Sequence, residues 1–313
     1  VPEALLPVVA KATNYLPAER YGSVDEMRRA LDAAAAGLPP DHSDRVWYMT
    51  QLCNLARVRG DYQQALEYAA RARQMAEAGG YRWHALRADF NEAMTCWRMG
   101  DLERARERAE ACARVPEAAN FASDTLRLLS YLAQQRGELA EAEALLLESS
   151  EAASAAGDLQ AEGHCLLGLG ELEKQAGRLA AARATITRAL ARYRDAGFRW
   201  GQAECTNVLG DLARLEGDLE TAGRCYQQAL EGYRLIGSSS ATFVRINLGM
   251  LKLRQGDAAG ARALLSRSLA TLQRRQRISV AAAVEIMLLP CAAHDRDWAA
   301  WDAHIAGAGA VLA

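Results

Sequence analysis

The stretch EGDLETA, residues 216–222, is one of six copies of a turn motif that decides the fold. The other copies are RGDYQQA (59–65), MGDLERA (99–105), RGELAEA (136–142), AGRLAAA (176–182) and QGDAAGA (255–261). Their glycines recur every 37 to 40 residues, at Gly60, Gly100, Gly137, Gly177, Gly217 and Gly256. Repetition with such a period predicts stacked copies of one supersecondary unit. A degenerate seventh copy, HDRDWAAW (294–301), has no glycine.

Three further positions keep step with each turn glycine. The residue seven positions before it is small: Cys53, Ala93, Ser130, Gly170, Gly210 and Gly249. The residue five positions after it is alanine: Ala65, Ala105, Ala142, Ala182, Ala222 and Ala261. The residue twelve positions after it is small again: Ala72, Cys112, Ser149, Ala189, Ala229 and Ser268. Small side chains let two helices cross closely, so each repeat is predicted to be a helical hairpin with the glycine in its turn.

The composition agrees with this prediction and excludes several classes of function. Ala, Leu, Arg and Glu are abundant, and all are good helix formers. The net charge is −2, which gives no global attraction to nucleic acid or to an anionic membrane. No apolar run approaches the roughly 20 residues of a membrane helix. Glu3 stands where a signal peptide would carry basic charge, and no cleavage site follows, so we expect a cytoplasmic protein.

The seven cysteines and five histidines show no pattern of a metal or catalytic site. There is no CxxC pair, and no histidine lies at ligand spacing from a cysteine. Cysteines in this arrangement are typical of small buried residues in a reducing compartment. We therefore expect no metal, no cofactor and no enzymatic activity in this chain.

The phased small residues, turn glycines and alanines resemble the tetratricopeptide repeat, in its longer variant, over residues 43–313. Leu169-Gly170, Leu209-Gly210 and Leu248-Gly249 match a dipeptide of that family. The resemblance implies an all-α protein, a right-handed α-α superhelix of six to seven helical hairpins. It also implies a concave face lined by the first helix of each hairpin. Arrays of this family bind peptides or protein surfaces and carry no chemistry of their own.

The segment before the repeats has a different pattern. Residues 15–31, YLPAERYGSVDEMRRAL, lie between two predicted helices, and Ser23 with Glu26 forms a capping-box pattern at the second. Pro17, Arg20, Tyr21 and Ser23 resemble the end of the C-terminal lobe of a bacterial serine/threonine protein kinase. That resemblance implies a structural salt bridge for Arg20. The alternative is a helical cap on the array. No glycine-rich loop, catalytic loop or metal-binding motif of a kinase is present.

These observations divide the chain into three parts. Residues 1–36 are the kinase-like helical segment, residues 37–44 (GLPPDHSD) are a linker, and residues 45–313 are the repeat array. The first functional hypothesis is a non-catalytic interaction region of a kinase, which recruits substrates or regulators in signalling. The alternatives are the repeat sensor region of a large transcriptional activator and a free-standing scaffold. The oligomeric state stays open.

The family resemblance places one set of residues in the groove. The candidate residues are Trp47, Asn54, Arg57, Arg87, Phe90, Asn91, Trp97, Arg98, Arg127, Tyr131, His164, Glu171, Lys174, Asn207 and Arg214. The N-terminal half of this set is basic and aromatic, which favours an acidic or phosphorylated peptide bound through arginine–anion pairs. A clamp for a C-terminal carboxylate is rejected: Asn54 and Asn91 match its asparagines, but Thr50, Asp124 and Leu128 occupy its basic positions.

Overall fold

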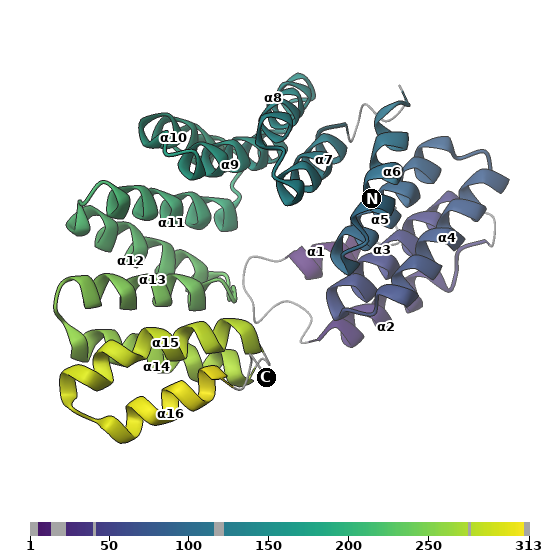
Figure 1. Ribbon diagram of the computed structural model, residues 1–313. Helices are drawn as coiled ribbons and strands as arrows, with labels where there is room; N and C mark the ends of the chain where they lie inside the picture. The colour runs from purple at the N-terminus through teal and green to yellow at the C-terminus, as the bar shows by residue number, and fades with distance from the viewer. Residues whose placement is uncertain (1–5, 14–22, 40–41, 116–121, 275–276, 310–313) are drawn as a thin grey trace. The chain divides into compact units, whose positions relative to one another are not determined.

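The structure is a computed structural model that describes residues 6–13, 23–39, 42–115, 122–274 and 277–309. These residues form sixteen helices and no strand (Figure 1). The helices are α1 (Leu6–Thr13), α2 (Val24–Ala35), α3 (Ser43–Arg59), α4 (Tyr62–Ala78), α5 (Arg82–Met99), α6 (Leu102–Ala113), α7 (Ala122–Arg136), α8 (Leu139–Ala155), α9 (Leu159–Gln175), α10 (Leu179–Asp195), α11 (Arg199–Leu215), α12 (Leu219–Leu235), α13 (Ala241–Arg254), α14 (Ala258–Arg274), α15 (Ile278–Asp295) and α16 (Trp298–Gly309). The chain forms two compact units, Val1–Leu172 (unit 1) and Glu173–Ala313 (unit 2).

Within each unit the helices form consecutive hairpins, and each hairpin packs on its neighbour (Figure 1). The pairs are α3 with α4, α5 with α6 and α7 with α8 in unit 1, and α11 with α12, α13 with α14 and α15 with α16 in unit 2. The predicted all-α repeat solenoid is confirmed. A single hairpin cannot bury its apolar face, so the stacked pairs share a continuous core within each unit.

The Gly-Asp pair of the turn motif ends one helix and begins the next. Gly217 has a φ of 88°, in the left-handed region that glycine adopts without steric cost. The Asp218 amide then donates to the carbonyl of Ala213 (2.9 Å), which closes the end of α11. The Asp218 carboxylate accepts from the Thr221 amide (3.0 Å), which caps the start of α12.

The seventh turn confirms the degenerate copy of the motif and shows that its backbone is strained. Arg296 takes the place of the turn glycine with a φ of 57°, and it is the one non-glycine residue with positive φ among the described residues. The Asp297 amide still closes the turn on the carbonyl of Ala292 (3.0 Å). An arginine in the left-handed region is strained by its Cβ.

We therefore expect Arg296→Gly to raise the free energy of unfolding of unit 2 by about 0.5–1 kcal/mol. Guanidinium unfolding followed by circular dichroism measures this change. The control is Arg296→Ala, which removes the same side chain but keeps the strained backbone, and it should give no gain. Equal gains from both variants would contradict the backbone explanation.

The small residues at fixed spacing from the turn glycines lie at the helix crossings. The six alanines five positions after each turn glycine are fully buried. At Gly210 the packing excludes an added methyl group, because its Cβ would lie 2.8 Å from the Tyr226 ring. The pattern therefore reports close helix contacts, as the sequence predicts.

Helices α1 and α2 pack on the first hairpin of the array. Val8 and Leu31 form a small core with Trp47 and Tyr48 of α3. The Ser23 hydroxyl accepts from the Glu26 amide (3.1 Å), which confirms the Ser23 half of the predicted capping box, and the Glu26 carboxylate pairs with Lys11 (3.3 Å). Pro17, Arg20 and Tyr21, on which the kinase resemblance depends, lie outside the described residues. The predicted linker, 37–44, contains the start of α3 at Ser43.

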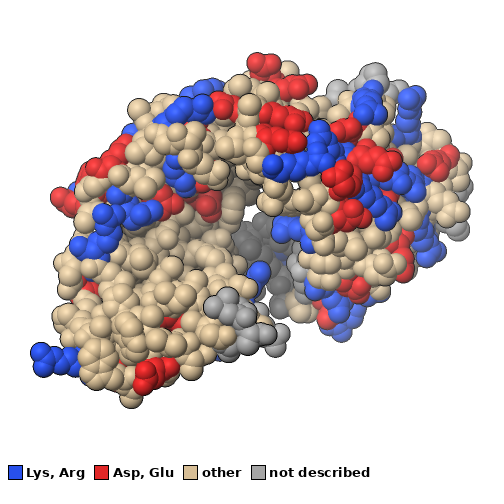
Figure 2. Space-filling view, viewed as in Figure 1, with Lys and Arg blue, Asp and Glu red and all other residues tan. Residues whose placement is uncertain are grey.

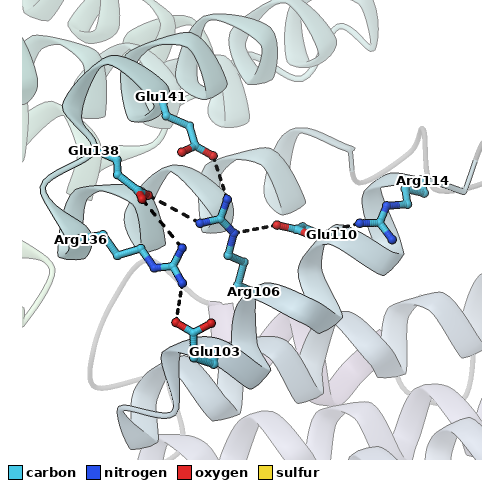
Figure 3. Close-up of polar contacts among 7 residues, drawn as sticks. All are labelled: Glu103, Arg106, Glu110, Arg114, Arg136, Glu138 and Glu141. Carbon is cyan, nitrogen blue, oxygen red and sulfur yellow. Dashed lines mark hydrogen bonds and ion pairs between the residues drawn. The ribbon is translucent and has the colours of Figure 1, made fainter.

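Charged side chains connect the second and third hairpins of unit 1 (Figure 3). Arg106 of α6 pairs with Glu110 (2.7 Å) on its own helix and with Glu141 of α8 (3.2 Å). Arg136, at the end of α7, pairs with Glu103 of α6. These side chains are partly or fully exposed to water, so each pair contributes little to stability.

A more buried carboxylate lies on α5. Glu92 is 6% exposed and pairs with Arg104 (2.6 Å), Arg108 (3.4 Å) and Arg73 (3.5 Å). The first two arginines belong to α6 and the third to α4, so Glu92 joins three helices through one buried charge. The periodic pattern of small residues gives no indication of this cluster.

By length and composition alone, α15 is the one described helix that could cross a membrane. The structure places it in the repeat stack, where Val284 and Leu288 pack on Leu265 of α14. Buried Glu285 lies 2.5 Å from His304 of α16, and such a pair suits a core helix contact. The visible face over α14–α16 carries few charges (Figure 2).

Candidate functional site

The first helices of the hairpins carry the predicted groove residues. In unit 1, α3, α5 and α7 supply three arginines without a carboxylate partner, one arginine with such a partner, and a stacked aromatic pair. We call Arg57, Arg87 and Arg98 the arginine site. Arg57 lies on α3, whereas Arg87 and Arg98 lie on α5.

Arg57 is the centre of the arginine site. Its Nη2 donates to Oδ1 of Asn54 (2.8 Å), one turn earlier on α3, while its Nη1 is buried without a hydrogen-bond partner. Burial lowers the pKa of Arg57, Cys53 opposes this shift, and the charges of Arg98 and Arg87 lower the pKa further. Within the described ranges, no carboxylate pairs with any of the three arginines. A buried donor without a partner is costly, so the site is electrostatically prepared for an anion.

An aromatic pair lies beside the arginine site. The rings of Trp97 and Tyr131 stack with centroids 5.6 Å apart and planes 11° apart, which joins α5 to α7. The guanidinium carbon of Arg98 lies 4.8 Å from the centroid of the Trp97 ring. This cation–π contact fixes the direction of Arg98 without neutralising its charge. Arg98 is therefore oriented and still available to an anion.

Arg127 differs from the three arginines of the site because it has a carboxylate partner. Its Nη2 donates to Oδ1 of Asp124 (2.6 Å), although its Nε is buried without a partner. His164 of α9 lies near this pair, and its Nδ1 is 2.7 Å from the carbonyl oxygen of Gln160. Burial lowers the pKa of His164, and the charge of Arg127 lowers it further. Gln160, Asp124 and Asp158 raise the pKa of His164, but each has a smaller effect.

This lowered pKa predicts a pH dependence of stability. The unfolded chain protonates His164 near its ordinary pKa of about 6.5, whereas the folded chain resists protonation. The unfolded state then binds more protons, so the free energy of unfolding falls as the pH falls below that value. Denaturant unfolding of wild type and His164→Gln at several pH values measures the effect. The variant should lose less stability on acidification, and identical profiles would contradict the role of His164.

The structure places some predicted groove residues in the core instead. Phe90 is 7% exposed and belongs to a core cluster with Leu86 and Leu128, and Asn91 is 3% exposed. Residues of α6 and α7 pack on α5 in this cluster and cover Phe90. Trp47 packs partly on the core made by α1 and α2. These three residues do not form an open surface for a ligand.

In unit 2 the predicted polar residues pair with one another. Lys174 lies 3.6 Å from Asp211, and Asp211 accepts from the hydroxyl of Tyr226 (2.6 Å), to which the Arg214 Nε also donates (3.3 Å). Asn207 accepts from Asn247 (3.2 Å). The charges of these residues are balanced, so they do not form a counterpart of the arginine site. Glu171 lies on α9, at the end of unit 1.

The sequence identifies the arginines but does not show that Asn54 orients Arg57. The sequence predicts Asn54 as a separate groove residue, whereas the structure shows that it holds the Arg57 guanidinium. Their spacing of three residues on one helix is the available signal. Within the described ranges, no group of three or more His, Cys, Asp or Glu residues could hold a metal ion.

Sequence comparison now relates this architecture to a known repeat. Residues 86–111, 124–148 and 202–274 match models of the tetratricopeptide repeat. These three segments are similar to the tetratricopeptide repeat. These matches fall on α5–α8 and α11–α14, the hairpins whose turns and small residues are described above. No curated protein matches the sequence of the chain.

Solved structures of similar fold share little sequence with these repeats. A Signal Transduction ATPase with Numerous Domains with a tetratricopeptide repeat sensor, from Pyrococcus horikoshii, has a TM-score of 0.68 and 15% identity. The match covers 99% of this chain and 47% of that one, so the chain spans about half its length. A Rap protein complexed with Competence and Sporulation Factor has a TM-score of 0.65 and 11% identity, over 91% and 79% of the two chains. Aspartyl phosphate phosphatase F from Bacillus subtilis has a TM-score of 0.66 and 11% identity, over 99% and 79%. At these identities the likeness shows the fold alone.

Proposed function

We propose that this chain is a non-catalytic protein-interaction module and that unit 1 binds an acidic segment of a partner protein at the arginine site. The observation that carries the proposal is the isolation of Arg57, Arg87 and Arg98 from any described carboxylate. Surface arginines are usually paired or free in solvent, whereas Arg57 is largely buried beside two further positive charges. An anionic partner would relieve this repulsion.

The role of the parent protein is a separate part of the proposal. Because a repeat sensor occurs in a larger signalling ATPase of the same fold, we favour a sensor or recruitment region within a signalling protein. Attachment to a bacterial serine/threonine kinase stays a prediction, since neither matched repeat model reaches residues 1–36. The packing of α1 and α2 on α3 suits the helical-cap interpretation. A cytoplasmic location is proposed because all seven cysteines are free thiols.

Fluorescence anisotropy tests acidic-segment binding directly. The probe is a labelled glutamate-rich peptide, and its matched control is the same peptide with glutamine in place of glutamate. We expect the chain to bind the first peptide more tightly, with an affinity that falls as salt is added. Equal binding of the two peptides would contradict the proposal.

A variant pair locates the binding. Arg57→Ala should lower the affinity for the glutamate peptide about tenfold or more, because a charge-assisted hydrogen bond is lost. Arg71→Ala removes an exposed arginine of α4 and should leave the affinity unchanged. If both variants lower the affinity equally, general positive charge explains the binding and the arginine site does not.

A further inference from the structure

The arginine site has more positive charge than one carboxylate can neutralise. The charges of Arg87 and Arg98 on α5 both act on Arg57 of α3, and among the described residues no carboxylate pairs with any of the three. An aspartate or glutamate of a partner brings one negative charge. A phosphorylated serine or threonine brings about −1.5 to −2 charges at neutral pH, together with three strong acceptor oxygens. The charge balance therefore favours the phosphate.

The donors of the site are also held in place before any ligand arrives. Asn54 fixes one edge of the Arg57 guanidinium, so that the buried Nη1 stays without a partner. The Trp97 ring, itself stacked on Tyr131, holds Arg98. Donors that are oriented in advance lose less conformational entropy on binding. Planar forks from two helices suit a tetrahedral anion with several acceptor oxygens.

We propose that the arginine site recognises a phosphomonoester on a peptide, so that the partner is a phosphorylated protein segment. This inference rests on the proposed function, which requires only an acidic segment. It assigns the phosphate contacts to Arg57 at the centre with Arg87 and Arg98 beside it. Binding would then depend on phosphorylation of the partner.

Anisotropy with three labelled peptides tests the inference. The peptides share one sequence and carry phosphoserine, glutamate or serine at the central position, within an otherwise glutamate-containing segment. We expect the phosphoserine peptide to bind about tenfold or more tightly than the glutamate peptide, because it adds charge and acceptor oxygens. Equal affinity for these two peptides would overturn the inference but leave acidic-segment binding intact. Failure of all three to bind would contradict both.

The variant Arg57→Lys distinguishes the hydrogen-bonding geometry of the guanidinium from its positive charge. Lysine keeps the positive charge but cannot form two parallel hydrogen bonds with one phosphate. The preference for phosphoserine over glutamate should therefore shrink in Arg57→Lys, while circular dichroism shows an unchanged helical content. Arg71→Lys is the matched control and should keep the full preference. An unchanged preference in Arg57→Lys would overturn the assignment of Arg57 to the phosphate.

Discussion

Gly210→Ala should destabilise unit 2 by about 1–3 kcal/mol, although alanine is the better helix former. The added Cβ would lie 2.8 Å from two carbons of the Tyr226 ring and 3.2 Å from Cβ of Cys225. Tyr226 is fully buried, and its hydroxyl is held by Asp211 and Arg214. The ring therefore cannot move aside without losing these hydrogen bonds. Guanidinium unfolding and hydrogen exchange of α11 and α12 measure the loss.

The control for this prediction lies in the same hairpin. Gly223→Ala places its Cβ 3.3 Å from Cδ2 of Leu251, the far end of a flexible side chain. Here the helix propensity should dominate and stabilise the chain by up to about 1 kcal/mol. The same substitution thus has opposite signs at two positions of one repeat. If both variants gain stability, the close crossing at Gly210 does not constrain the fold.

Glu92→Ala should destabilise unit 1 by about 2–3 kcal/mol, the second large effect. The carboxylate is buried and receives charge-assisted contacts from Arg73, Arg104 and Arg108. Its removal leaves Arg104 and Arg108 without this partner, whereas Arg73 keeps Asp89 (3.0 Å), and it opens a cavity between α4, α5 and α6. The arginines are partly exposed and can turn to solvent, which keeps the loss below that of a fully buried pair. Thermal and denaturant unfolding measure it.

The matched control is Glu103→Ala in the exposed network of Figure 3. Glu103 also pairs with an arginine, Arg136, but its side chain is 81% exposed. We expect a change within about 0.5 kcal/mol, because water screens the pair. Similar losses for Glu103→Ala and Glu92→Ala would show that burial does not decide the strength of these ion pairs.

The repeat architecture can be predicted because it depends on local sequence features that recur with a fixed period. A turn glycine such as Gly217 reports a left-handed backbone, and a buried alanine such as Ala222 reports a close helix contact, whatever the rest of the chain does. The seventh hairpin also follows from the pattern, although Arg296 replaces the glycine there. Periodicity identifies such positions even when one of their signals is missing.

The site can be predicted less completely because periodicity gives the face of a helix but not its neighbours. Phe90 occupies a groove position in the repeat, yet α6 and α7 bury it. Asn54 is predicted to contact a ligand, yet it hydrogen bonds to Arg57. Ion pairs between helices, such as those of Glu92, depend on side-chain reach across hairpins. None of these contacts follows from a one-dimensional pattern.

NMR of the arginine Nε–Hε groups during titration with the phosphoserine peptide tests the central claim most directly. We expect the resonances of Arg57, Arg87 and Arg98 to shift together and to saturate as peptide is added. The resonances of exposed Arg71 and of Arg114, which pairs with Glu110, should stay in place. Binding of the peptide without any shift at the three arginines would contradict the claim that the arginine site receives the partner.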